Sequence, residues 1–263
     1  MGFVPQPNAH MGYATLTHPT NNCTYLLSTG EMIKAMKTET NRITTRSTST
    51  MRGYAAIAGT LVWLSLGLQL YLTMALAISN GVGLWVGIAR YFGYFTILTN
   101  ILVALVLTMP LIRLRSHWGL FFSQPGVRTA TAVYIAIVGI GYSLLLRNIW
   151  NPQGWQLLAD RMLHDFTPIV YVVFWFAFVP KGTLRWRDLL AWLIYPLVYL
   201  MVALIRGAIF SWYPYPFLEA NKLGYPQVLF NIAMLFVGFC VVGLLFIGIA
   251  RLMRRNYATR ESQ

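Results

Sequence analysis

Residues 91–112 read YFGYFTILTNILVALVLTMPLI and contain no charged side chain. A helix needs about 20 mostly apolar residues to cross the hydrocarbon core of a bilayer, and a helix satisfies its own backbone hydrogen bonds there. The stretch therefore predicts a transmembrane helix. Thr96, Thr99 and Asn100 are three and four residues apart, so they fall on one face of it.

The composition of the whole chain excludes a soluble protein. Hydrophobic residues make up 57% of the 263 positions and charged residues only 10%, whereas soluble domains carry about 25% charged residues. A net charge of +13 would indicate a nucleic-acid partner in a soluble protein. Here the basic residues lie between apolar runs, so they indicate membrane topology and no nucleic-acid partner.

Six apolar runs are long enough to cross a membrane, and breaker residues such as Gly and Pro separate them. We expect an all-α polytopic membrane protein built as a six-helix bundle. The runs are Tyr54–Ser79, Tyr91–Arg113, Thr129–Leu146, Ala159–Val179, Leu189–Ile209 and Gln227–Ala250.

The basic residues predict the orientation of the bundle. Most of the 20 Lys and Arg residues lie in the N-terminal region, the second-to-third and fourth-to-fifth connections, and the C-terminal tail. Because cytoplasmic segments carry the excess of Lys and Arg, we expect both termini in the cytoplasm. The other side keeps Arg90, Arg147, Arg161, Arg206 and Lys222.

We expect three parts along the chain. Residues 1–52 are rich in Ser, Thr and Asn, which favours a disordered cytoplasmic tail. Met51, followed by Arg52 and the first apolar run, would also make a good start site, so an overlong gene start is the alternative. Residues 53–250 form the transmembrane domain, and residues 251–263 form a basic cytoplasmic tail.

Five of the predicted helices place polar side chains in the half of the membrane nearer the outer surface. Such groups need partners in hydrocarbon, so we expect them to face the bundle interior and line a pocket open to the outside. Besides the second helix, the contributors are Ser143 and Arg147, His164, Tyr195, Tyr199 and Arg206, and Asn231.

Taken singly, each of these residues except His164 has a purely structural explanation that we favour. Threonine bonds the carbonyl four residues earlier, asparagine joins helices, and arginine side chains reach the headgroups. An ionisable residue inside the membrane is a functional candidate by default. No second His or HExxH spacing accompanies His164, so we expect no metal.

His164 suits proton transfer near neutral pH. A hydroxyl nucleophile needs only hydrogen-bond reach to such a base, and Thr96 and Thr99 lie at matching depth. The group that orients the imidazole stays open between Asp160, four residues earlier on the same face, Asp165, which is adjacent, and neither. Asp160 serves equally well as the N-cap of the fourth helix.

Three strings resemble the androgen-induced membrane hydrolase family and related bacterial six-span membrane proteins: YFTILTN (94–100), LHDFTPIV (163–170) and WYPYPFLE (212–219). The similarity covers about residues 54–250. Members of the family hydrolyse fatty acid esters of hydroxy fatty acids. The resemblance implies that Thr96 is the nucleophile, that His164 is the base, and that the protein lies in a bacterial cytoplasmic membrane.

We therefore expect an intramembrane Thr–His hydrolase that cleaves lipid esters near the outer leaflet without a cofactor. Asn100 or Asn231, supported by Thr99, would donate to the oxyanion. Arginine pairs with carboxylates through two parallel hydrogen bonds, so the expected substrate-binding residues are Arg147, Arg206, Tyr199 and Ser143.

Two other functions compete with this one. The same polar groups would serve a transporter or binding protein for a small lipophilic anion, although no internal repeat, which many transporters contain, is evident. A non-catalytic membrane scaffold would use them only to pack helices.

Overall fold

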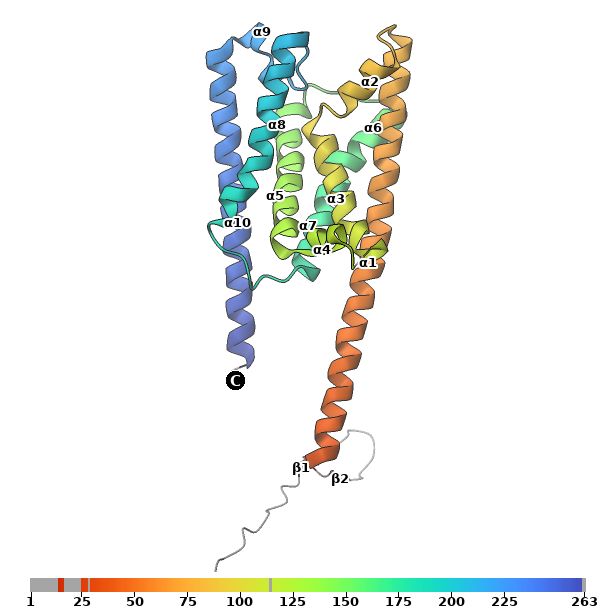
Figure 1. Cartoon of the computed structure of the whole chain (residues 1–263), viewed down its shortest axis with the longest axis vertical. Helices are drawn as coiled ribbons and strands as arrows, with labels where there is room; N and C mark the ends of the chain where they lie inside the picture. Colours follow the sequence, from red (N-terminus) through yellow and green to blue (C-terminus); the bar gives the residue numbers. More distant parts are fainter. Residues whose placement is uncertain (1–13, 17–24, 28, 114, 262–263) are drawn as a thin grey trace, which may run out of the picture. The chain divides into compact units, whose positions relative to one another are not determined.

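The computed structural model describes the backbone of residues 14–16, 25–27, 29–113 and 115–261. Contacts divide the chain into two compact units, Met1–Gly53 and Tyr54–Gln263. Apart from two three-residue strands in the first unit, the regular structure of the described backbone is helical (Figure 1). The predicted all-α class is confirmed.

The first unit contains the strand pair and the beginning of a long helix. β1 (Ala14–Leu16) pairs antiparallel with β2 (Tyr25–Leu27), and α1 (Thr29–Ser79) follows. The sequence predicts no regular structure before residue 53, so the start of α1 at Thr29 corrects that prediction for its described part. No proline interrupts α1, so a helix nucleated in its apolar half propagates towards the N-terminus. Residues 1–13, 17–24 and 28 of the predicted tail lie outside the described residues.

The second unit contains the apolar half of α1 and the remaining elements. Two of them, η1 and η2, are π-helical turns; η1 extends α5, and η2 joins α6 to α7 without a break. The bounds are α2 (Leu84–Tyr91), α3 (Phe95–Ile112), α4 (His117–Ser123), α5 (Pro125–Gly141), η1 (Tyr142–Leu146), α6 (Gly154–Arg161), η2 (Met162–Phe166), α7 (Thr167–Phe178), α8 (Asp188–Phe210), η3 (Pro216–Leu218, a 3₁₀ turn), α9 (Ala220–Leu223) and α10 (Tyr225–Glu261).

Within the described residues, five helical segments are long and apolar enough to cross a membrane. The protein is thus a multi-pass integral membrane protein. The segments are Thr48–Ser79, Phe95–Ile112, Pro125–Leu146, Asp188–Phe210 and Tyr225–Arg254. They correspond to the first, second, third, fifth and sixth predicted runs.

The predicted count of six crossings is not confirmed. The fourth predicted run is helical from Gly154 to Phe178, through α6, η2 and α7, but it is not among the five apolar segments. Two carboxylates, an arginine and a histidine lie between Asp160 and Asp165, and these groups lower the hydropathy of its first half. The residues that make this segment interesting for function are those that weaken its resemblance to a transmembrane helix.

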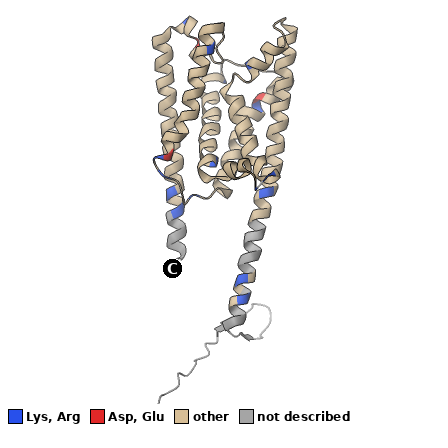
Figure 2. Cartoon of the chain, in the orientation of Figure 1, with Lys and Arg blue, Asp and Glu red and all other residues tan. Residues whose placement is uncertain are grey.

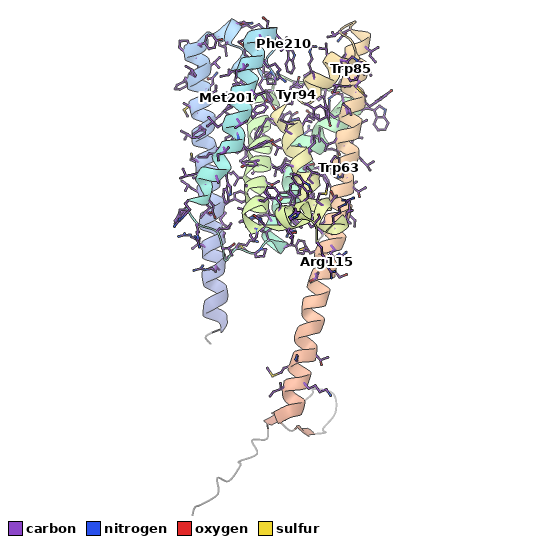
Figure 3. The ribbon with its side chains drawn as sticks, viewed as in Figure 1. Trp63, Trp85, Tyr94, Arg115, Met201 and Phe210 are labelled. Atoms are coloured by element: carbon purple, nitrogen blue, oxygen red, sulfur yellow. The ribbon has the colours of Figure 1, made fainter. Side chains whose placement is uncertain are left out.

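The exterior of the second unit is apolar. Trp85 is 80% exposed and Phe210 72%, and Figure 3 shows the coat of side chains to which they belong. In Figure 2, most of the ribbon of this unit is tan, the colour of residues other than Lys, Arg, Asp and Glu. Water-soluble proteins do not expose so many large apolar side chains, whereas the acyl chains of a bilayer solvate them.

α5 contacts five other α-helices of the unit, namely α3, α4, α7, α8 and α10. Fully buried side chains such as Ile135 of α5 and Trp175 of α7 fill the space between them. The Trp175 indole donates a hydrogen bond of 2.9 Å to the hydroxyl of Thr129, so its polar atom is satisfied inside the bundle. This packing fixes α3, which carries Thr96, and α7, which continues directly from the η2 turn that carries His164.

The second span begins later than predicted. The chain forms α2 up to Tyr91, turns through Phe92–Tyr94, and enters α3 only at Phe95. Gly93 permits this turn to approach α8, because a Cβ at this position would lie 2.2 Å from Nη1 of Arg206. Thr96 is consequently in the first turn of α3. α4, capped by the Ser116 hydroxyl, was not predicted.

Candidate functional site

A cavity of about 410 Å³ collects side chains from helices that are far apart in the sequence. Among the predicted site residues, it brings together Thr96 of α3, Asp160 of α6 and His164 of η2. Its lining also includes residues of the connections that follow α1, η1 and α8, namely Asn80, Trp150 and Trp212. The cavity therefore lies at the end of the unit where these connections are found.

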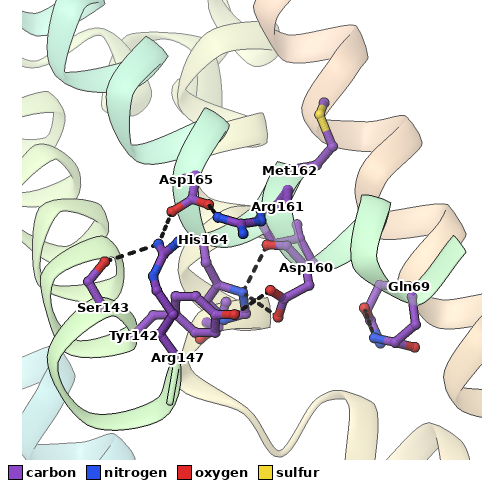
Figure 4. Close-up of polar contacts among 12 residues, drawn as sticks. Gln69, Tyr142, Ser143, Arg147, Asp160, Arg161, Met162, His164 and Asp165 are labelled. Carbon is purple, nitrogen blue, oxygen red and sulfur yellow. Dashed lines mark hydrogen bonds and ion pairs between the residues drawn. The ribbon is translucent and has the colours of Figure 1, made fainter. Parts of the chain in front are cut away.

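His164 and Asp160 form a pair one helical turn apart (Figure 4). The imidazole Nδ1 lies 3.0 Å from the Asp160 carbonyl oxygen and 3.2 Å from its Oδ1. Because both neighbours accept hydrogen bonds, they fit the tautomer with a hydrogen on Nδ1, in which the lone pair lies on Nε2. Asp160 is only 3% exposed, so its carboxylate orients the ring from a buried position.

Tyr142 holds this pair from the opposite π-helical turn. Its hydroxyl donates a 2.5 Å hydrogen bond to Oδ2 of Asp160, and its ring stacks on the His164 imidazole with centroids 4.1 Å apart. π-helical turns often occur at functional sites, and here the two of them meet at one ring pair. The imidazole is thus restrained on its face and at Nδ1, while Nε2 has no hydrogen-bond partner among the described residues.

Thr96 lies beside the hydroxyl of Tyr215, a residue of the connection between α8 and η3. The Thr96 amide donates to the Tyr215 oxygen at 3.2 Å, and the two hydroxyl oxygens are 3.4 Å apart. Burial raises the pKa of Tyr215 above its ordinary value, so the phenol stays protonated and can donate. In the described part of the chain, no hydrogen bond joins Thr96 to His164 directly.

A second cavity, of about 70 Å³, meets the first at these residues. Thr96, Tyr142, Leu146 and Tyr215 line both cavities. The rest of the second lining is largely apolar and includes Phe95 and Phe239. Thr96 therefore stands between a larger space with polar groups and a small apolar one.

Asn100 is fully buried and joins the two halves of the site. Its Nδ2 donates to the carbonyl of Thr96 at 2.8 Å and to that of Leu163 at 3.3 Å. Its amide hydrogens are therefore engaged, and the expectation that Asn100 donates to an oxyanion does not fit its contacts. It instead ties the first turn of α3 to the residue preceding His164.

The other predicted oxyanion residues also lie elsewhere. The Asn231 amide donates to the carbonyl of Phe217 at 2.9 Å, which fastens α10 to η3. Thr99 is fully buried, with its hydroxyl 3.3 Å from that of Tyr195. Neither lines the cavity of Thr96 and His164. Helical spacing placed them at matching depth but on sides of their helices that meet other partners.

Arg147, predicted to bind substrate, is neutralised within the chain. Its guanidinium pairs with Asp165, which also accepts from Arg161 at 2.9 Å, and it donates to the Ser143 hydroxyl at 3.2 Å (Figure 4). Arg147 and Ser143 thus belong to an ion-pair cluster that does not line the cavity. Asp165 is engaged by two arginines and does not contact the imidazole, so the contact that orients His164 comes from Asp160.

Arg206 and Tyr199 hold the turn between α2 and α3. Both donate to the carbonyl of Gly93, the Tyr199 hydroxyl at 3.0 Å and the Arg206 Nη2 at 3.3 Å. The buried Nε of Arg206 has no partner, and neither residue lines the larger cavity. Arg206 thus contacts the turn that precedes Thr96 in place of the predicted substrate. Tyr199 also lines the smaller cavity, so its substrate contact stays a prediction.

The comparisons with known proteins add no relative. No family model, no curated protein and no solved structure matches this chain. The described residues also hold no group of three or more His, Cys, Asp and Glu residues suited to a metal ion.

Sequence reasoning did not assign a role to Tyr142 or Tyr215. Tyr142 immediately precedes Ser143. It received no role because an aromatic residue in a membrane helix usually serves packing or anchors the helix at the interface. Tyr215 belongs to the WYPYPFLE string, which was the available signal. Its contact with Thr96 joins residues 119 positions apart, which helical spacing cannot reveal.

Proposed function

We propose that the protein is an intramembrane hydrolase of lipid esters in which Thr96 is the nucleophile and His164 the general base. The observation that carries the proposal is the Asp160–His164 pair, whose free Nε2 shares a cavity with the Thr96 hydroxyl. A hydroxyl, a base and an orienting carboxylate are the components of nucleophilic acyl transfer. Catalytic hydrogen bonds are often long before substrate binds, so the absence of a direct Thr96–His164 bond is compatible with this role.

In the proposed reaction, the Thr96 oxygen attacks the ester carbonyl carbon while Nε2 of His164 takes the hydroxyl proton. The tetrahedral intermediate collapses as the bond to the alkoxy oxygen breaks, and His164 returns the proton to the departing alcohol. Water then attacks the acyl-threonine with His164 again as base, which releases the carboxylic acid and restores Thr96. Ester and water become acid and alcohol, and no cofactor takes part.

Tyr215 replaces the asparagines as the proposed oxyanion donor. Its hydroxyl oxygen accepts from the amide of Thr96. Its hydrogen would turn from the Thr96 hydroxyl oxygen, 3.4 Å away, towards an oxygen bonded to the Thr96-linked carbon. A preorganised donor of this kind acts mainly on the charge of the transition state. The small apolar cavity beside Thr96 would take the part of an acyl chain next to the carbonyl.

The proposal includes a topology. Residues 154–178 would be the sixth crossing, stabilised by the ion pairs and the Asp160–His164 pair rather than by hydropathy. With both termini in the cytoplasm, as the Lys and Arg distribution favours, the cavity faces the outer leaflet of a bacterial inner membrane. Fluorescent-protein and alkaline-phosphatase fusions at residue 263 test this, since the first reports a cytoplasmic terminus and the second a periplasmic one.

The function is tested with purified protein in lipid nanodiscs and long-chain fatty acid esters of hydroxy fatty acids. Thr96→Ala and His164→Ala should each reduce hydrolysis to the rate of empty nanodiscs. Thr108→Ala is the matched control, because Thr108 lies on the same helix, bonds the Ala104 carbonyl and the Trp63 indole, and does not line the cavity. Full turnover by either site variant would refute the mechanism. Saturable uptake of the intact ester into liposomes without hydrolysis would favour the transporter.

A further inference from the structure

We propose that Arg90 is the residue that binds the anionic end of the substrate, a carboxylate or a phosphate, and so determines specificity. This inference rests on the proposed function and assigns a specificity-determining residue in the same site. Arg90 lies in the last turn of α2. It is the sole Lys or Arg among the residues that line the larger cavity.

Arg90 differs from the other arginines near the site in lacking an anionic or carbonyl partner. Arg147 and Arg161 share Asp165, and Arg206 donates to the Gly93 carbonyl. Within the described residues, no ion pair or hydrogen bond engages the Arg90 guanidinium. It is half-buried and lines the cavity, so a ligand in the cavity meets no competing partner at this guanidinium.

An aromatic platform holds Arg90 in this position. Its guanidinium carbon lies 5.6 Å from the Trp212 ring centroid. The rings of Tyr94 and Trp212 meet edge to face, with their centroids 5.7 Å apart and their planes at 89°. Stacking on an aromatic face leaves the in-plane N–H groups of a guanidinium free for a carboxylate or phosphate. Arg90 is therefore restrained without being neutralised.

The surrounding charges favour an anion at this rim. The Arg206 guanidinium carbon lies 4.4 Å from the same Trp212 ring, so two cations share one indole. The single acidic residue lining the cavity, Asp160, already accepts from Tyr142 and pairs with His164. Net positive charge thus remains at the mouth, which attracts anionic ligands and orients them.

This arrangement gives the substrate a direction. An amphipathic ester would place its anionic end on Arg90 at the rim and its carbonyl at Thr96 in the wall. The acyl limb would continue towards the small apolar cavity. Carboxylate and phosphate share the chemistry that a guanidinium binds, and the experiment distinguishes them.

The test compares three esters with the same acyl chain and length: one ending in a carboxylate, its methyl ester, and one ending in a phosphate. Arg90→Gln should raise KM for the preferred anionic ester by about 10- to 100-fold, the loss expected for a charge-assisted hydrogen bond. KM for the methyl ester and kcat for all three should stay near the wild-type values. Arg90→Lys should recover part of the loss. The anion with the larger increase in KM identifies the natural end group.

Arg251→Gln is the matched control, because Arg251 also lies over an indole, 4.5 Å from the Trp186 centroid, and does not line the cavity. Equal losses for charged and methylated esters in Arg90→Gln would assign Arg90 to packing and overturn the inference.

If no ester is hydrolysed by the wild-type protein, the proposed function fails. Saturable binding of radiolabelled hexadecanoate, measured by scintillation proximity, then decides the inference: loss in Arg90→Gln supports it, and unchanged binding overturns it.

Discussion

Asp160 and Asp165 are five residues apart on the same helical segment, yet they do opposite things. Asp160 is 3% exposed and contacts neutral or titratable groups, Tyr142 and His164. The Asp165 side chain is 29% exposed and sits between Arg147 and Arg161. A buried carboxylate with polar neighbours orients a reactive ring, whereas a partly exposed one between two arginines balances charge. The difference shows that burial and partners, more than residue type, separate the two roles.

The largest expected effect concerns Asp160, the buried carboxylate of the two. Asp160→Asn should lower kcat for ester hydrolysis by about 10²- to 10⁴-fold, because an amide no longer fixes the tautomer of His164 or stabilises its protonated form. The measurement is kcat in nanodiscs, with the melting temperature as a check on folding. Activity near the wild-type value would show that Asp160 does not serve the base.

The next effect concerns the hydroxyl of Tyr215, beside the proposed nucleophile Thr96. Tyr215→Phe should lower kcat by about 10²- to 10³-fold while KM changes little, since an oxyanion donor acts in the transition state. Tyr213→Phe is the matched control, because Tyr213 lies in the same connection but lines neither cavity. A rise in KM at constant kcat would instead assign Tyr215 to substrate binding.

A smaller effect tests how closely α5 approaches the backbone of His164. A Cβ at Gly139 would lie 3.1 Å from Pro168 Cβ and 3.3 Å from the His164 carbonyl oxygen. Gly139→Ala should therefore reduce the free energy of unfolding by about 1–3 kcal/mol through overpacking. Gly126→Ala on the same helix meets nothing within 4 Å and should leave stability equal or higher. Equal melting temperatures for both variants would contradict the tight contact.

The smallest expected effect completes the comparison. Asp165→Asn should keep kcat within about fivefold of the wild type, because partly exposed ion pairs contribute little. Its effect should shrink further at high salt, which screens such pairs. A loss as large as that of Asp160→Asn would mean that the arginine cluster supports the base after all.

The sequence allowed much of the fold to be predicted, because hydropathy alone marks a long apolar helix such as α8. It did not reveal that the fourth helical segment is less apolar than the other five. The polar residues of this segment contact other parts of the bundle. The turn before α3 also escaped prediction. Gly93 requires the guanidinium of Arg206, more than a hundred residues later, to explain it.

For the candidate site, spacing placed His164 four residues after Asp160, and the structure brings these two together with Thr96. Spacing failed for Arg147 and Asn231, whose partners come from other elements. It also gave no reason to choose Arg90 or Tyr215. Tyr215 lies on a connection, which has no helical periodicity, and Arg90 lies outside the predicted spans, on the short helix α2. The neighbours of both residues therefore become visible only in three dimensions.

The π-helical turn at Met162–Phe166 has a consequence for how such a protein can diverge. Thr167 donates to the carbonyl of Met162, five residues back, so the turn contains one residue more than an α-helix would use. Such an extra residue rotates everything before it relative to everything after it. The face that α7 presents to its neighbours can therefore stay unchanged while the reactive ring is re-aimed. Removal of one residue from this turn would therefore change the direction of the His164 ring without a change in the sequence of α7.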